Sequence, residues 1–355
     1  MKFSVIIILC VVFMMSLSGG CNFKPEPQPL PLSVRSTLNL LQEDPQFVMY
    51  LNFKSMSRTN FWRKNISDSI LNAEKTFGSI LNTFKNATGV SISNGLDEMY
   101  YSNSWFGENS IVLKGLFNKS KLDEYIKTDS LFSITKNADG KDIYIKTDNG
   151  LYFFFKDDFT ICASNYLKQI DAMMQISDTS ESGLLKNKKI YNSIENIIYK
   201  QDLWMVSTEK AFIKGIYQNF LGSTAGIKPE DEVDTDTSES NTNPSDEEKE
   251  KVTLENLYTK YNSVSFSAEM EDDILILIQN NFVSESPAKF FKSIMNGFLT
   301  VSRLSTGGKQ KPPAAKLLDK IRLNRYDNDV FIEVKIESGD LEMLRNTDLL
   351  SEPAL

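Results

Sequence analysis

The chain contains no histidine, and this limits the chemistry that its other side chains can do. Histidine-assisted serine and cysteine nucleophiles, histidine general bases and imidazole metal sites are all excluded. Serine acylases that need no histidine use Ser-x-x-Lys together with a Lys-Thr-Gly strand. No Lys-Thr of this chain is followed by Gly; it is followed by Asp at Asp129 and Asp148. We therefore interpret the three Ser-x-x-Lys matches as chance and expect no enzymatic activity: Ser133/Lys136, Ser207/Lys210 and Ser286/Lys289.

Acidic side chains gather where the sequence predicts hairpin turns. Asp157-Asp158, Glu271–Asp273 and the Asp327/Asp329 pair all lie between apolar runs, where Asp favours turn conformations. The segment 137–140 resembles part of a calcium loop but lacks the bidentate Glu six residues after its Gly. We expect turns at these positions, with no metal site and no cofactor.

One strand is unusually aromatic. Residues 151–155 read Leu-Tyr-Phe-Phe-Phe, which places large apolar groups on both faces of a strand. Two interpretations stay open. The segment is a core strand between two lobes, or one face, with Phe153 and Phe155, lines an apolar groove that binds a hydrophobic ligand.

The N-terminus has the pattern of an export signal. Lys2 is followed by an uncharged apolar run, then by Leu-Ser-Gly-Gly and Cys21. This segment resembles a bacterial lipoprotein lipobox, although Ser18 stands where that family usually carries Leu. The resemblance implies removal of residues 1–20, lipidation of the Cys21 thiol by diacylglyceryl and acyl (palmitate-type) chains, and attachment to the membrane. The alternative is an ordinary signal peptide with a chance cysteine. The run is shorter than the roughly 20 apolar residues that span a bilayer.

The segment after Cys21 carries a proline at every second position from Pro25 to Pro31. Alternating proline favours an extended chain of about 3.1 Å per residue. We expect residues 21–32 to form a semi-rigid stalk between the membrane and the folded body. Because Cys10 leaves with the signal peptide and Cys21 is lipidated, only Cys162 remains, and no internal disulfide can form.

The net charge of −8 comes from one stretch. Residues 229–251 contain ten acidic residues and two lysines, and almost no apolar side chains. Such a composition does not support a packed core, so we expect a disordered insertion. The remainder is close to neutral and shows no basic face, which excludes nucleic acid as a partner.

The predicted elements occur in the same order twice. A strand at 47–53 is followed by a long helix at 59–85, a strand pair, a helix, a meander and a helix at 166–176. A second strand at 202–207 begins a similar series that ends near residue 345. The spacing predicts an α+β fold of two similar lobes, each an antiparallel sheet covered by helices, as after an internal duplication. The expected organisation is 1–20 signal peptide, 21–32 stalk, 33–190 first lobe, 191–345 second lobe with the 229–251 insertion, and 346–355 tail.

The body also resembles exported bacterial families of unknown function. The matching residues are Glu43-Asp44-Pro45 before a strand and the apolar run 111–117, which ends in Gly-Leu-Phe. The resemblance implies no activity. We expect a lipid-anchored, non-enzymatic envelope protein on the exported side of the membrane, at the outer membrane or its periplasmic face if the cell has two membranes. It would bind or scaffold another envelope component. The alternative is a carrier or sensor of a hydrophobic ligand held between sheet and helices.

Overall fold

The computed structural model describes residues 24–66, 77–92, 94–148, 150–176, 182–225, 252–305 and 313–345. The predicted signal peptide, Cys21, the acidic insertion and the C-terminal tail lie outside these residues. In the described part, no helix is both long enough and apolar enough to cross a bilayer.

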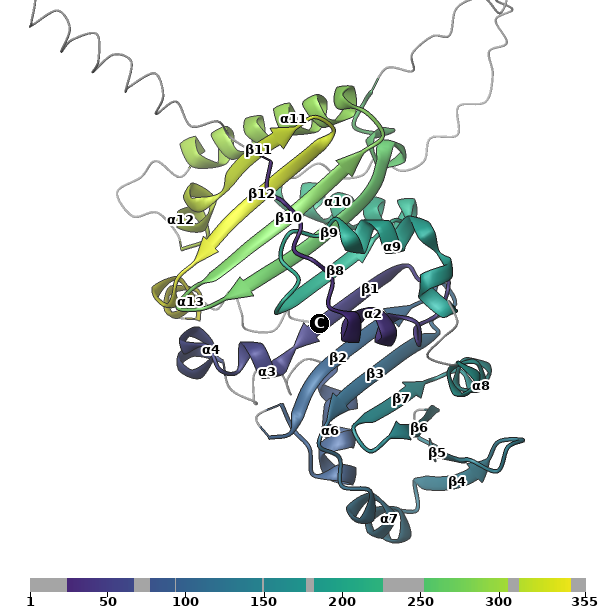
Figure 1. Ribbon diagram of the computed structural model, residues 1–355. Coiled ribbons are helices and arrows are strands. Elements are labelled where there is room, and N and C mark those ends of the chain that lie inside the picture. Colours follow the sequence, from purple (N-terminus) through teal and green to yellow (C-terminus); the bar gives the residue numbers. More distant parts are fainter. Residues whose placement is uncertain are drawn as a thin grey trace, which may run out of the picture.

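The strands form one antiparallel sheet of twelve strands, in the order β11-β12-β10-β9-β8-β1-β2-β3-β7-β6-β5-β4 (Figure 1). The strands of the first half are β1 (Phe47–Asn52), β2 (Leu96–Asn103), β3 (Asn109–Gly115), β4 (Phe132–Lys136), β5 (Asp142–Lys146), β6 (Leu151–Asp157) and β7 (Thr160–Ser164). Those of the second half are β8 (Leu203–Ser207), β9 (Tyr261–Met270), β10 (Ile274–Phe282), β11 (Arg322–Tyr326) and β12 (Asp329–Ile336). The fold is α+β, as predicted.

The two predicted sheets are in fact one sheet. The first strands of the two halves, β1 and β8, pair antiparallel, with Met49 opposite Met205 and Tyr50 opposite Trp204. Each of these strands would otherwise present a row of unpaired backbone groups, and their pairing satisfies both. Alternation of apolar residues predicts strands but does not show which strands become neighbours, so this joint could not be read from the sequence.

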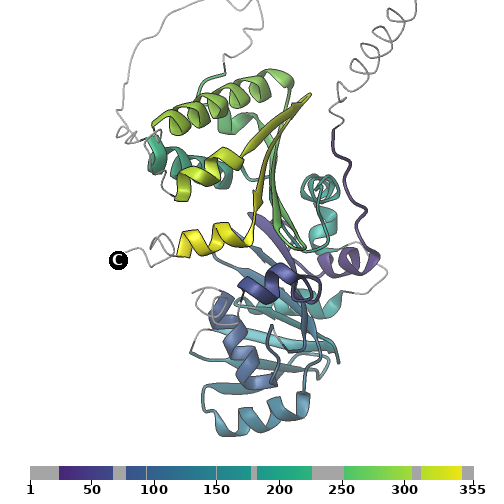
Figure 2. The ribbon, with the colours of Figure 1, turned by 90° about the vertical axis from the view of Figure 1, so that its left-hand side faces the viewer.

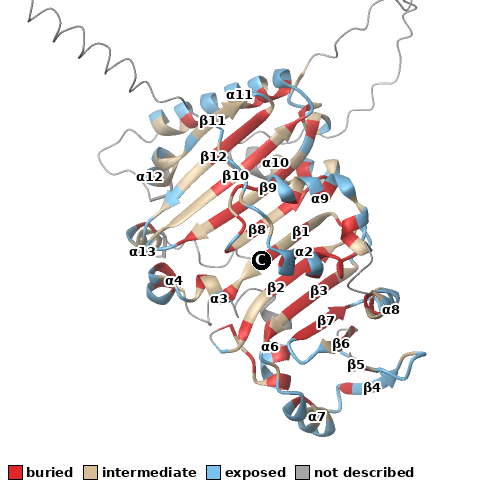
Figure 3. Ribbon diagram, in the orientation of Figure 1, coloured by how far each residue is buried: buried red, intermediate tan, exposed pale blue. Residues whose placement is uncertain are grey.

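Helices cover both faces of the sheet (Figure 2). On one face, α2 (Leu32–Leu38), α8 (Leu167–Gln175) and α9 (Lys188–Glu195) pack around Tyr50, Tyr100 and Trp204. On the other face, α3 (Phe53–Met56), α4 (Asn60–Asn65), α6 (Phe77–Thr88) and α7 (Lys119–Thr128) cover the first half. There α10 (Lys210–Ala225), α11 (Glu285–Ser305), α12 (Pro313–Lys320) and α13 (Ser338–Arg345) lie along the second half. The buried residues follow the central strands (Figure 3).

The helix predicted at 59–85 is wrong as one element. The side chain of Thr59 accepts a hydrogen bond from the Trp62 amide and caps α4, which ends at Asn65. Ile66 then adopts an extended backbone, with φ −114° and ψ 127°. Trp62 of α4 and Leu81 and Phe84 of α6 pack into the same core, as they would from a single helix.

The connection between the two halves contains structure of its own. A 3-10 turn, η1 (Gly183–Lys186), precedes α9, whose first turn is capped by the side chain of Asn187. Ile190 and Ile194 of α9 are fully buried in the core beside Trp204. Another 3-10 turn, η2 (Leu257–Lys260), leads into β9.

Candidate functional site

The described part of the Pro-rich segment packs against the body instead of standing away from it. Residues 24–31, here called the strap, cross the sheet in front of β10 and β9 and lead into α2 (Figure 1). The Gln28 amide donates to the Ile198 carbonyl at 3.1 Å, and the Lys200 amide donates to Gln28 Oε1 at 2.9 Å. The predicted stalk therefore does not hold for these residues, since the backbone and the side chain of Gln28 both bond to the second half.

Lysine side chains hold the strap at two places. The Lys200 ammonium donates to the Gln28 carbonyl, and to the Glu195 carbonyl at 2.7 Å. Lys200 is 2% exposed, and this burial lowers its pKa to about 8. At the other end, Lys24 Nζ lies 2.5 Å from Asp329 Oδ2 at the start of β12. The Asp329 carboxylate also accepts a hydrogen bond from the Asn281 side chain, so it joins the strap to two strands.

A groove of about 700 Å³ lies between the strap, α9 and the exposed part of the sheet. Ser263 and Ser265 of β9 and Gln279 and Asn281 of β10 form its floor. The strand register places Gln279 opposite Ser265 and Asn281 opposite Ser263, so the four side chains make two adjacent cross-strand pairs. The α9 wall is also polar, and it consists of Lys189, Asn192, Ser193 and Asn196.

Gln279 has an unusual environment in this floor. Its side chain is nine-tenths buried, with 8% exposed, and its Oε1 has no hydrogen-bond partner among the described residues. Buried polar atoms in folded proteins are nearly always paired. No sequence pattern marked this site, because Ser, Asn and Gln at alternating strand positions are typical of an ordinary solvated face.

A second surface feature is the turn between β2 and β3. Phe106 is 91% exposed and Trp105 52% exposed, so two large aromatic side chains project from one turn. The backbone beneath them is fixed: Asn165 Nδ2 donates to the Gly107 carbonyl at 2.8 Å, and the Asn109 amide donates to Asn165 Oδ1 at 2.7 Å. Gly107 has φ +74°, a conformation that a side chain disfavours. We call Trp105 and Phe106 the aromatic tip.

The aromatic residues singled out in the sequence pack into the core. Phe153 is fully buried, stacked on Tyr144 at 5.1 Å between centroids and edge-on to Phe84 at 5.3 Å. Phe155 is half-buried and lies edge-on to Phe117 at 6.3 Å. Their strand, β6, lies near the β4 edge of the sheet, not between the two lobes. The strands at the junction of the two halves are β1 and β8, which pair with each other.

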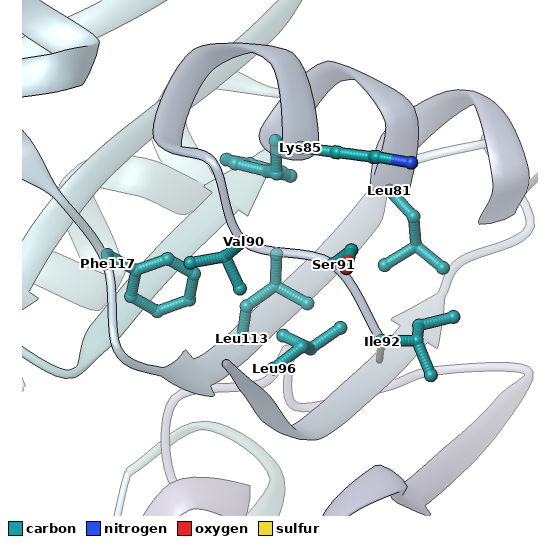
Figure 4. Close-up of a pocket in the computed structure, with 9 residues that line it drawn as sticks. Leu81, Lys85, Val90, Ser91, Ile92, Leu96, Leu113 and Phe117 are labelled. Carbon is teal, nitrogen blue, oxygen red and sulfur yellow. The ribbon is translucent and has the colours of Figure 1, made fainter. Parts of the chain in front are cut away.

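An apolar pocket does lie next to Phe117, under α6 (Figure 4). Its walls include Leu81, Val90, Ile92 and Leu113. Its volume is about 10 Å³, which is room for about one water molecule. Neither Phe153 nor Phe155 lines it.

The Ser-x-x-Lys pairs and the acidic turns have structural partners. Ser133 and Lys136 lie on the exposed strand β4, Ser207 Oγ donates to the Gln46 carbonyl at 2.5 Å, and Lys289 pairs with Glu285 at 2.9 Å. Asp157 accepts from the Phe159 amide at 2.8 Å, as expected in a turn. Among the described residues, no three acidic or cysteine side chains are grouped as metal ligands would be.

Comparison with known proteins gives little. No protein-family model matches the sequence, and no curated protein matches it. Among solved structures, crystal form III of TP0453 aligns with a TM-score of 0.46 and 7% identity, over 92% of this chain and 100% of that one. Crystal form I of TP0453 aligns with a TM-score of 0.43 and 9% identity, over 91% and 99%. With TM-scores below 0.5, this likeness supports no conclusion about function.

Proposed function

We propose that this chain is a lipid-anchored, non-enzymatic protein of the bacterial cell envelope that holds another envelope component close to the membrane. The anchor is the Cys21 thiol, on the lipobox-like pattern of the sequence. The aromatic tip is the observation that supports partner binding. Two large aromatic side chains displayed on a turn whose backbone is tied down by Asn165 form a rigid contact element. Exposed aromatic groups of this kind are enriched in protein–protein contacts.

The strap sets how close the body lies to its anchor. Lys24 follows Cys21 by three positions, so their Cα atoms are at most about 11 Å apart. Since Lys24 is paired with Asp329, a lipid on Cys21 would hold the start of β12 near the bilayer surface. The strand pairings place the start of β12 and the β2–β3 turn at the same end of their strands.

We also propose that the two halves arose by internal duplication. The support is their strand order. In the first half, β1, β2 and β3 are followed outward by β7, the last strand of its meander. In the second half, β8, β9 and β10 are followed outward by β12, again the last strand of its series. The proposal would be tested by superposing the two halves and finding equivalent core positions.

The carrier hypothesis gains no support from the apolar pocket under α6. Its volume of about 10 Å³ is far below the roughly 300 Å³ at which small-molecule pockets begin. Phe153 is in the packed core on the same side of the sheet.

The test of the anchor is metabolic labelling of the full chain with an alkyne fatty acid in a bacterial host. We expect the native chain to carry the label and to be found in the membrane fraction. The Cys21→Ala variant should carry no label and should be absent from that fraction. Equal labelling of both chains would contradict the proposal.

The test of partner binding is a photo-crosslinking amino acid at position 106 of the anchored protein. We expect one discrete crosslinked species that Trp105→Ala removes. The matched control places the same crosslinker at Asp139, an exposed turn residue between β4 and β5. If positions 106 and 139 gave the same crosslinked species, the crosslink would reflect random collision and not binding at the aromatic tip.

A further inference from the structure

The groove under the strap has the dimensions of a binding site. Its volume of about 700 Å³ lies within the range of about 300–1,000 Å³ that holds small ligands. Its floor belongs to a sheet, and one wall to a helix whose Ile190 and Ile194 are in the core, so both are rigid. Sites built on such elements keep their geometry better than sites on loops.

The groove is polar but electrically balanced. Two lysines and two acidic residues line it, Lys24 and Lys189 with Glu26 and Asp329. Lys24 and Asp329 are paired with each other, and the Lys189 ammonium donates to the Thr208 carbonyl at 3.0 Å. With Glu26 balancing the charge of Lys189, the lining offers a phosphate or carboxylate ligand no net positive charge. The chemistry therefore favours an uncharged ligand.

The other polar lining groups are hydroxyls and carboxamides. The pairs Ser265–Gln279 and Ser263–Asn281 put such groups about 5 Å apart across the strands and about 7 Å apart along them. Asn192 of α9 and Asn196, which follows this helix, also line the groove. Each hydroxyl both donates and accepts, and each carboxamide does the same. The Asn281 carboxamide is already bonded to Asp329 and Asn262. The other groups match a ligand whose own polar groups both donate and accept at similar spacings.

Some of the lining is apolar. Pro25 and Pro27 of the strap and Ile198 after α9 border the same groove. A sugar ring has an apolar C–H face together with hydroxyl edges, so it can satisfy both kinds of lining at once. An apolar ligand would leave the floor unpaired, at an energetic cost.

A peptide strand fits this site less well than a sugar. The floor is the face of the sheet, and β9 and β10 both have neighbouring strands on either side. Their backbone groups are used in the sheet, so an added strand would find no edge to pair with.

From these observations we propose that the groove between residues 24–27, α9 and the β9–β10 face binds a neutral oligosaccharide. Gln279 is the central residue of the floor. Its Oε1 is buried and has no partner in the described part of the chain, and rotation of the carboxamide toward the groove would let a ligand hydroxyl supply one. This inference deepens the proposed function, on which it rests, by naming the chemical class of one envelope component.

The experiment is isothermal titration calorimetry of the purified full chain with chitotetraose and with cellotetraose. Chitotetraose carries hydroxyl and acetamido groups, and cellotetraose carries hydroxyls alone. We expect saturable binding of chitotetraose, and weaker binding of cellotetraose. Absence of binding by both at millimolar concentration would overturn the proposal. Binding of an extended peptide, with neither sugar bound, would overturn it as well.

Two variants locate the binding. Gln279→Leu removes the floor carboxamide at nearly constant volume and should weaken binding at least tenfold. Asn192→Ala, on the exposed side of α9, tests the opposite wall. It should also weaken binding, and it serves as the test if Gln279→Leu does not fold. Gln175→Leu, an exposed carboxamide on α8, is the matched control and should bind as the native chain does. Binding that survives both groove variants would place the sugar elsewhere and contradict the proposal.

The outcome is separable from that of the proposed function. Fatty-acid labelling of Cys21 and crosslinking from position 106 do not depend on the groove. A chain that is labelled and crosslinked but binds no sugar loses this inference and keeps the proposed function. A chain that binds sugar but is not labelled keeps the binding groove and loses the lipid anchor of the proposed function.

Discussion

Tyr50 and Trp204, 154 positions apart, lie directly opposite each other in the β1–β8 pairing, with their ring centroids 5.5 Å apart. Both side chains are almost fully buried. This pairing joins the two halves of the sheet. The packing of Trp204 against Tyr50 and Tyr100 therefore couples the second half of the chain to the core of the first half. The two halves should therefore unfold together.

Trp204→Ala tests this joint. We expect a loss of about 3–5 kcal/mol in the free energy of unfolding, since the substitution removes a large buried side chain. The measurement is urea denaturation of the full chain followed by fluorescence and by circular dichroism. Trp105→Ala is the control, because this half-exposed residue should change stability by no more than about 0.5 kcal/mol. Equal effects of the two substitutions would contradict the assigned packing.

The buried lysine that fastens the strap should make stability depend on pH. Burial lowers the pKa of Lys200 from 10.5 to about 8 in the folded protein. Between these two values the unfolded chain binds more protons at this position than the folded chain does. The contribution of Lys200 to the free energy of unfolding therefore rises as the pH goes from about 8 to about 10.5, by on the order of 3 kcal/mol.

Comparison with Lys200→Met isolates this contribution from the other titrating groups. Chemical denaturation at several pH values between 8 and 10.5 measures the free energy of unfolding of both chains. The native chain should gain stability relative to the variant as the pH increases. A constant difference between them would show that Lys200 titrates normally in the folded state.

Cys162 should resist thiol reagents while the protein is folded. Its side chain is fully buried in β7, and burial raises its pKa to about 12. Both effects keep the reactive thiolate scarce and inaccessible. Iodoacetamide treatment followed by peptide mass spectrometry should leave Cys162 unmodified in buffer and modify it in urea. Rapid alkylation in buffer would show that the β7 region opens readily.

Gly183 should not accept a side chain. Its φ is +47°, and an added Cβ would lie 2.3 Å from the carbonyl oxygens of both Asn39 and Leu41. These carbonyls belong to the backbone between α2 and β1, which cannot shift without disturbing the buried residues Leu40 and Leu41. Gly183→Ala should therefore cost at least about 2 kcal/mol more than Gly140→Ala.

Gly140 is a suitable control because it also has a positive φ, +78°, but an added Cβ there meets nothing within 4 Å. Thermal unfolding of the two variants measures the difference. Similar melting temperatures would mean that the 39–41 segment can move away from η1.

The aromatic residues show why the position of a strand in the sheet cannot be read from its composition. The sequence of residues 151–155 predicted a strand with large apolar groups on both faces, and left open whether one face lined a groove. In the structure β6 has Phe153 in one core and Phe154 in the other. Its place near the β4 edge depends on which strands pair, and β3 pairs with β7, which lies next to β6. That pairing joins residues about 50 positions apart.

Local patterns were sufficient to predict the α+β class and most of the elements, because apolar alternation and turn residues act over a few neighbouring positions. The sequence also carried the prediction of the lipid anchor, which rests on a short contiguous pattern ending at Cys21. The neighbours of each strand and the position of the strap depend on contacts between residues far apart in the sequence. Pairing of β1 with β8 made one sheet of two, and the contact of Lys24 with Asp329 turned a predicted stalk into a strap. The groove exists only because these long-range contacts bring the strap, α9 and two strands together, and no local pattern records them.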